Sequence, residues 1–288
     1  IINLDKQKSI IKNLDFCLTN DQIKSLEEIN KDLSSSNKMF RLLQGDVGSG
    51  KTIVSLLGAI NTINSGFQVA FMAPTEILAN QHFMLAKKIF PNINIELLSG
   101  KSEYKKKKET LKKLENKKID IIFGTHAIFQ KKVIFKKLGL IIIDEQHKFG
   151  VNQRKRLSDK GGSNCDVLLM TATPIPRTLT MTIYGDMDIS IIHEKPKSRK
   201  PIKTYSKLEI KINDVLKFIK KEIKHGNQVF WVCPLIEESK KLDHSSAIKK
   251  FEYLKQKFPN QVCLLHGKTN IEEKNEILNN FLKNKFKI

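Results

Sequence analysis

The stretch RLLQGDVGSGKT, residues 41–52, decides the fold of this chain. The apolar residues at its start predict a buried strand over 40–44, and the helical period after it predicts a helix over 51–64. The turn between them matches G-x-x-x-x-G-K-[ST], the pattern of a loop that holds phosphate groups. Its glycines let successive backbone N–H groups point inward, and the helix N-terminus adds partial positive charge. The stretch therefore predicts a strand, a phosphate-binding loop and a helix in an α/β domain.

The loop supplies most of the candidate nucleotide-binding residues. They are Gly45, Gly48, Ser49, Gly50, Lys51 and Thr52. Lys51 is expected to reach the β- and γ-phosphates, and the Thr52 hydroxyl is expected to hold Mg²⁺. A nucleoside triphosphate and Mg²⁺ are therefore the expected cofactors.

A second stretch, LIIIDEQHKFG at residues 140–150, places two acids directly after a buried run. In a nucleotidase with a phosphate loop, the second metal-holding group is an Asp at the end of a neighbouring strand, where Asp144 stands. Parallel strands deliver such residues to the carboxyl edge of the sheet, where ligands bind. Glu145 is then placed to polarise the attacking water as a general base. Lys51, Asp144 and Glu145 are the predicted catalytic residues, with Thr52 and Asp144 as ligands of Mg²⁺.

Polar residues beside these acids predict a relay. Hydrolysis needs only the two acids, so Gln146 and His147 are expected to sense the γ-phosphate and to pass its state on. The stretch MTATP, residues 170–174, ends the next expected strand with the hydroxyl residues Thr171 and Thr173. We predict that these two threonines respond to the nucleotide state.

Short apolar runs alternate with stretches of helical period along the first two thirds of the chain. The expected strands are 40–44, 68–72, 93–98, 120–123, 138–144, 166–170 and 188–192. They are rich in Ile, Val, Leu and Phe, as strands buried on both faces are. Helical periods over 51–64 and 77–90 are examples of the connections between them. This alternation predicts an α/β fold with a parallel sheet and right-handed crossovers.

The stretch HEKPKSRKPIKT, residues 193–204, interrupts this alternation with two prolines and five basic residues. The pattern then restarts, with strands expected at 202–208, 228–233 and 261–265 and helices at 210–224, 239–257 and 271–286. We predict a first domain over 1–195, a linker over 196–205 and part of a second domain over 206–288. Because the chain begins with Ile1 and stops just after a helical stretch, we expect a fragment of a longer protein.

Composition favours a polyanionic partner but does not prove one. The chain has 51 basic and 30 acidic residues, a net charge of +21, which is typical of proteins that bind nucleic acid. Enrichment of Lys on solvated faces by an A/T-biased genome is the alternative explanation.

The four cysteines form no C-x-x-C pair, and no apolar run approaches a membrane span, so reduced thiols and a cytoplasmic location are expected.

The longer motifs resemble one family. The strings are RLLQGDVGSGKT, MAPTEILANQHF, GTHAIFQ, DEQHKFGVNQR, MTATPIPRTL, YGDMDIS and PLIEES. DEQH together with TATP resembles a superfamily-two helicase motor, and the full set is similar to the RecG family of bacterial branched-DNA helicases, from about Phe16 to the last residue. The resemblance implies a complete RecA-like P-loop domain, a truncated second RecA-like domain, ATP as the nucleotide and double-stranded, branched DNA as the partner, in recombination and repair.

The resemblance also implies roles for further residues. Gln22, in FCLTNDQ, matches the adenine-recognising position, although Asp15 stands where the family often has Pro. Arg177, in PIPRTL, matches a residue that couples the two motor domains, and a surface Arg is the competing interpretation. The segments expected to hold the DNA backbone are Pro74 and Thr75 in APTE, and Gly124 and Thr125 in GTH. For APTE, a Pro at the first position of a helix is a purely structural alternative.

Two other functions remain open from the sequence. The Mfd family of transcription–repair coupling translocases shares several of these strings, but it usually has an acid at the position of Gln146. A nucleotide-gated DNA-binding module without turnover would have lost Lys51 or Glu145, and both are present. The resemblance further implies a wedge domain and an arginine-bearing segment outside this sequence.

Overall fold

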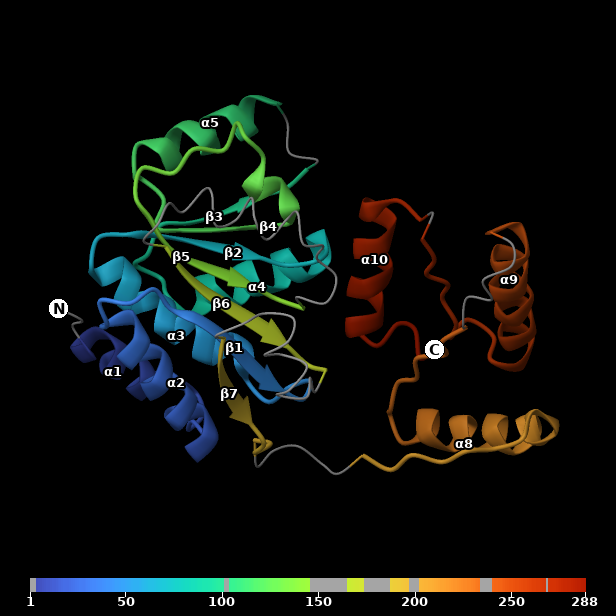
Figure 1. Ribbon diagram of the computed structural model, residues 1–288. Helices are drawn as coiled ribbons and strands as arrows, with labels where there is room; N and C mark the ends of the chain where they lie inside the picture. Colours follow the sequence, from blue (N-terminus) through green and yellow to red (C-terminus); the bar gives the residue numbers. More distant parts are fainter. Residues whose placement is uncertain are drawn as a thin grey trace. The chain divides into compact units, whose positions relative to one another are not determined.

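The computed structural model describes residues 4–100, 104–145, 165–173, 187–196, 202–233, 240–267 and 269–288 (Figure 1). Contacts between residues divide the chain into two compact units, Ile1–Lys200 and Pro201–Ile288. The segment 196–205, predicted as a linker, spans the boundary between these units.

The first unit is built on a seven-stranded sheet in which every paired strand is parallel. The strands are β1 (Phe40–Gly45), β2 (Gln68–Met72), β3 (Ile95–Leu98), β4 (Ile121–Gly124), β5 (Leu138–Ile143), β6 (Asp166–Thr171) and β7 (Asp188–Ile192). Their order across the sheet is β3-β4-β2-β5-β6-β1-β7. The predicted α/β class and all seven predicted strand positions of this unit are confirmed.

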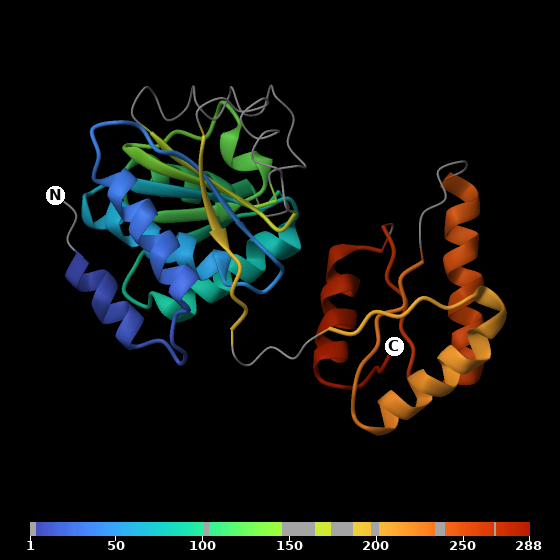
Figure 2. The ribbon, with the colours of Figure 1, turned by 60° about the horizontal axis from the view of Figure 1, so that its bottom comes forward.

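Helices cover both faces of this sheet (Figure 2). One face packs against α3 (Lys51–Asn64) and α4 (Glu76–Ile89), with α1 (Leu4–Lys12) and α2 (Asn20–Leu33) packed on α3. The other face carries α5 (Tyr104–Glu115) and the 3₁₀ turn η1 (His126–Phe129). Because side chains alternate along a strand, Leu43 and Phe71 belong to the first core and Leu42 and Met72 to the second.

The second unit is helical within its described residues. It contains the 3₁₀ turn η3 (Glu209–Lys211) and the helices α8 (Ile212–Lys224), α9 (Lys240–Lys257) and α10 (Ile271–Leu282). A small core joins Leu216 and Ile219 of α8 to Leu254 and Phe258, with Ile288 beside them. The last helix ends at Leu282 and not at the expected residue 286, and Asn284 takes the left-handed conformation (φ 62°).

The strands predicted at 202–208, 228–233 and 261–265 are wrong as secondary structure, because these segments form no strand. The second and third meet the end of the chain through isolated bonds. Val229 N donates to Lys287 O (2.8 Å), and the backbone N–H groups of Lys287 and Ile288 both donate to Gln261 O (2.8 and 3.0 Å). A strand needs a continuous ladder with a neighbour, and apolar sequence alone does not provide one.

A buried amide joins three segments of the first unit. Gln68, at the start of β2, is fully buried. Its Nε2 donates to Leu114 O and Ile119 O, both at 2.9 Å, and its Oε1 accepts from Lys137 N at 3.0 Å. The amide nitrogen and the amide oxygen of this side chain are therefore both satisfied by backbone groups.

Replacing Gln68 by Met keeps the side-chain volume but leaves these backbone groups without partners. An unsatisfied buried polar group costs about 1–3 kcal/mol, so we expect Gln68→Met to lower the free energy of unfolding by about 2–4 kcal/mol. Denaturant unfolding measures it. Gln81→Met, at an exposed position of α4, is the matched control and should change stability by less than about 0.5 kcal/mol. Equal stabilities of the two variants would contradict the role of Gln68.

Candidate nucleotide site at the carboxyl edge of the sheet

The strand order brings three predicted site segments to one edge of the sheet. Strand β6 lies between β1 and β5. Its last residue, Thr171, pairs with Gln44, immediately before the phosphate loop, and Asp144 follows β5 directly. Because all three strands run in the same direction, the loop, the acids and the threonines emerge together.

The loop after β1 depends on glycines at two positions. Gly48 (φ 77°) and Gly50 (φ 90°) take left-handed conformations that other residues adopt only with strain. A Cβ on Gly50 would lie 2.3 Å from Gln22 Nε2. The loop also presents a buried hydroxyl, because Ser49 Oγ has no hydrogen-bond partner among the described residues. A narrow glycine-rich turn with an unsatisfied hydroxyl fits a phosphate group.

Lys51 begins α3, and its side chain turns back over the loop. Its Nζ donates to Gly45 O (2.6 Å) and to Asp46 O (3.1 Å). Burial lowers the pKa of Lys51 below its ordinary value, while the negative charges of Asp144, Glu145 and Asp46 act in the opposite direction. A bound phosphate would add negative charge beside this cation and strengthen its charged form.

Gln22 braces the loop from α2. Its Nε2 donates to Ser49 O (2.7 Å), and its Oε1 accepts from Thr19 N (2.9 Å) within the capping box that begins α2. These contacts occupy the amide oxygen and one of its two N–H bonds. The adenine contact expected for Gln22 stays a prediction, and the structure adds a bracing role that sequence reasoning did not find.

The two acids after β5 lie close to Lys51. Asp144 is mostly buried, its backbone N–H donates to Met72 O (2.9 Å), and its Oδ2 lies 2.9 Å from His82 Nε2. Glu145 adopts φ 50°, the left-handed region, which costs a non-glycine residue about 1–2 kcal/mol. Such strain concentrates at functional sites, where the surrounding structure holds it in place.

His82 is a site residue that sequence reasoning missed. It lies on α4, one helical turn after the buried Ala79 and one turn before the buried Ala86. The signal that could have found it is a polar residue on the buried face of an amphipathic helix next to the site. Its partner Asp144 is 62 residues away in the sequence, so periodicity alone could not identify the pair.

The two threonines at the end of β6 bond to each other. Thr171 is fully buried, and its Oγ1 lies 2.9 Å from Thr173 Oγ1 and accepts from Thr173 N (3.2 Å). This closed turn stands between the phosphate loop and the acids. The other predicted coupling residues, Gln146, His147 and Arg177, lie outside the described residues.

The segments predicted to hold DNA leave two neighbouring strands, β2 and β4. They are joined where Ala73 N donates to Gly124 O (2.9 Å). Thr75 caps α4 by accepting from Leu78 N (3.3 Å) and is exposed, and Thr125 is partly exposed. Gly124 also has a packing role, since a Cβ there would lie 2.8 Å from Leu98 O. Both segments therefore present backbone and hydroxyl groups at one edge.

The residues present fit a magnesium nucleotide but not a metal held by protein alone. In the described part of the chain, no group of three or more His, Cys, Asp and Glu could hold an ion. Mg²⁺ in nucleotide sites uses one or two protein oxygens together with phosphates and waters. Thr52 and Asp144, the two residues predicted to hold Mg²⁺, would match that number.

The segment after β7 returns to the same loop. His193 N and Glu194 N donate to Asp21 Oδ2 (2.8 and 2.9 Å), and Lys195 Nζ lies 2.6 Å from Asp46 Oδ2. The bond from Lys195 holds the pKa of Asp46 below its ordinary value. The last described residues before 197 are thus fastened to α2 and to the phosphate loop.

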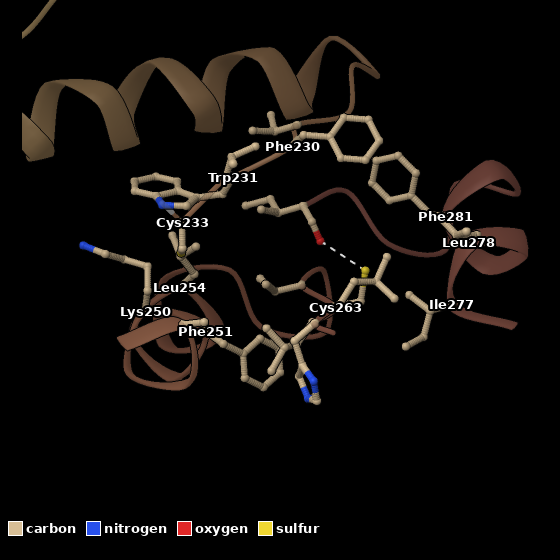
Figure 3. Close-up of a pocket in the computed structure, with 18 of the residues that line it drawn as sticks. Phe230, Trp231, Cys233, Lys250, Phe251, Leu254, Cys263, Ile277, Leu278 and Phe281 are labelled. Carbon is tan, nitrogen blue, oxygen red and sulfur yellow. Dashed lines mark hydrogen bonds between the residues drawn. The ribbon is translucent and has the colours of Figure 1, made fainter. Parts of the chain in front are cut away.

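A cavity of about 610 Å³ lies in the second unit and has a different character (Figure 3). Its wall is mostly apolar and aromatic, including Trp231, Phe251 and Phe281. None of the predicted site residues lines it. Its composition does not suit a triphosphate, so size does not identify the nucleotide site here.

Cys165 is a structural thiol. All four cysteines are free, and Cys165 is buried beside β6. Burial raises the pKa of the Cys165 thiol to about 12, which leaves it protonated and unreactive at neutral pH. Within the described residues, no helix is long and apolar enough to cross a membrane.

Comparisons with known proteins converge on one family. A family model described as DEAD/DEAH box helicase matches residues 19–182. The ATP-dependent DNA helicase RecG of Streptococcus pneumoniae serotype 4 is 47% identical over 289 residues, covering 99% of this chain and 43% of the relative. The same-named protein of Bacillus subtilis strain 168 is 48% identical over 278 residues, covering 95% and 41%. The chain therefore spans about two fifths of the length of these curated relatives.

Solved structures agree with this assignment. A structure of RecG bound to a three-way DNA junction matches with a TM-score of 0.81 at 39% identity, covering 100% of this chain and 38% of that chain. The DEAD-box helicase Mss116, bound to single-stranded RNA and UDP-BeF, matches with a TM-score of 0.73 at 19% identity, covering 98% and 62%. The second likeness shows the fold alone. The first unit is thus a RecA-like helicase domain.

Gly50 provides a test of the brace between α2 and the loop. We expect Gly50→Ala to lower the free energy of unfolding by about 1 kcal/mol or more beyond Gly66→Ala. Both glycines are left-handed (φ 90° and 80°), but a Cβ on Gly66 meets only Lys117 Nζ at 3.4 Å. Denaturant unfolding gives the difference. If the brace is the cause, adding Gln22→Ala to Gly50→Ala should cost less than the sum of the single changes, and strict additivity would argue against it.

Proposed function

Because this chain belongs to the DEAD/DEAH box helicase family, we propose that it is the motor segment of an ATP-dependent DNA helicase of the RecG type. The whole protein would use ATP to translocate on double-stranded DNA and to unwind or reverse branched intermediates in recombination and fork repair. The branched substrate is suggested by the RecG relative bound to a three-way junction. A cytoplasmic location is part of this proposal.

The observation that carries the proposal is the convergence of Lys51, Asp144 and Glu145 at one edge. All three lie close enough for the two carboxylates to act on the pKa of the Lys51 ammonium. A cation for the phosphates, a carboxylate for a metal and a second carboxylate for water are the three groups that phosphoryl transfer to water needs.

Each residue then has a separate part in hydrolysis. Lys51 leaves its bonds to Gly45 O and Asp46 O and donates to the β- and γ-phosphates. Thr52 and Asp144 are the residues that would hold Mg²⁺, which when bound neutralises phosphate charge. Glu145 accepts a proton from the water that attacks the γ-phosphorus, so that phosphate and ADP are the products. The strained backbone at Glu145 fits a residue held in place for this purpose.

The neighbouring ends of β2 and β4 are proposed to bind the DNA backbone. The exposed Thr75 hydroxyl and the start of α4 suit phosphates, and Thr125 lies on the adjacent segment. Contacts of this kind read no bases, so they fit a motor that moves along any sequence. The net charge of +21 adds long-range attraction.

We expect Lys51→Ala to weaken binding of Mg·ATP at least tenfold while the protein stays folded. The reason is the loss of the only predicted phosphate-binding cation in the loop, on a side chain whose ammonium bonds to the loop carbonyls of Gly45 and Asp46. Calorimetric titration measures the affinity, and circular dichroism checks the fold. Lys108→Ala, an exposed position on α5, is the matched control and should bind as wild type. Equal affinities in all three proteins would overturn the nucleotide site.

The function itself is tested with the full-length protein. Hydrolysis of ATP should rise when a three-way DNA junction is added, and by more than with a linear duplex of the same length. Glu145→Gln should bind ATP normally and lower the rate of hydrolysis by a factor of at least about 10², because it keeps the shape but not the base. If no DNA stimulates ATP hydrolysis, the remaining function is a nucleotide-gated DNA-binding module without turnover. ATP hydrolysis that shows no preference for branched DNA, in a protein that displaces RNA polymerase from DNA, would favour an Mfd-type translocase.

A further inference from the structure

The His82–Asp144 pair connects the proposed metal site to the helix that begins at the proposed DNA contact. His82 Nε2 and Asp144 Oδ2 are 2.9 Å apart, and each side chain is only 12% exposed. An ionised carboxylate can only accept, so Nε2 must be the ring nitrogen that carries the proton in this bond. The bond fixes one oxygen of Asp144 and leaves the other oxygen for a ligand.

The imidazole is held by the sheet as well as by its partner. The ring of Phe71, in the middle of β2, lies 4.8 Å from the His82 ring and is tilted by 43°. Phe71 in turn stacks on Phe123 of β4, with ring centroids 4.9 Å apart. His82 therefore has a defined position over β2 and β4, the two strands that lead to the proposed DNA segments.

Helix α4 connects His82 to the proposed DNA-binding segment at Thr75. It begins after Thr75, and Glu76 in its first turn accepts from Gly100 N (2.8 Å) and Ser99 Oγ (3.1 Å). His82 follows about two turns later on the same rigid element. A displacement of the helix start on binding a phosphate backbone would therefore move the imidazole, and with it the carboxylate.

We propose that His82 is a positioning residue for Asp144, which orients the carboxylate toward the metal of the bound nucleotide and makes that orientation depend on DNA bound at the start of α4. This inference rests on the proposed function and assigns it a physical link. Residues that hydrogen-bond to a metal ligand commonly change metal affinity by 10–100-fold when they are replaced. A purely structural role would predict lower stability without any change in metal affinity.

Two polar replacements separate these alternatives. The amide nitrogen of His82→Gln can take the place of Nε2 and still donate to Asp144, whereas the shorter side chain of His82→Asn cannot reach it. Both variants keep a polar side chain of moderate size, so both should fold. His225→Leu, at an exposed histidine in the second unit, controls for loss of a histidine as such.

The measurement is binding of Mn²⁺ to the full-length protein with saturating ADP, followed by electron paramagnetic resonance, with thermal unfolding of the ligand-free proteins alongside. We expect His82→Asn to weaken Mn²⁺ binding at least tenfold and His82→Gln to stay within about threefold of wild type. In wild type a three-way DNA junction should shift the Mn²⁺ affinity, and in His82→Asn that shift should fall to less than a third.

The outcomes distinguish failure of this inference from failure of the proposed function. Equal Mn²⁺ affinity in wild type, His82→Asn and His82→Gln would overturn the positioning role while leaving the nucleotide site intact. Loss of affinity in both variants in proportion to lower unfolding temperatures would assign His82 a structural role only. If wild type with ADP does not bind Mn²⁺ at all, the nucleotide site itself is wrong.

Discussion

Parallel pairing of β1, β6 and β5 is the constraint on which the rest of the structure depends. Residue-by-residue alignment of these strands fixes the distance between the phosphate loop and Asp144, with Thr171 between them. The strands are buried on both faces, so a slip of one residue would move the side chains of each core into the other and disrupt the packing of both. The site is held rigid by this pairing, because its polar groups lie at the ends of the paired strands.

The loop and the acids solve the same problem in opposite ways. Glycines at 48 and 50 remove the strain of a tight turn, and Gln22 then fixes the turn from a neighbouring helix. Glu145 keeps its strain, and the buried strand before it holds the residue in place. The phosphate loop therefore has a fixed shape without backbone strain, whereas Glu145 has a fixed position with backbone strain.

Much of this could be predicted from the sequence, for identifiable reasons. The seven strands of the first unit are short, apolar and separated by helical periods, and the loop motif carries its own geometry. The contacts of Gln22 and His82 could not be predicted, because they join segments that only the tertiary fold brings together. In the second unit the apolar runs at 228–233 and 261–265 have the composition of strands, but the strand prediction is wrong. They fail as strands because pairing is a property of two segments, and the backbone bonds from these runs to residues 287–288 are too few to form a ladder.

The ion pair between Lys195 and Asp46 has a mechanical consequence. It sits where the chain leaves the first unit, and both side chains are about half exposed (51% and 57%). Tension applied to the chain beyond Lys195 therefore reaches the phosphate loop through this ion pair as well as β7 through the backbone. A solvent-exposed pair is screened by salt and yields more easily than a ladder of buried backbone bonds. The link between the exit of the chain and the phosphate loop is therefore weakened by salt, whereas the backbone pairing of β7 with β1 is not.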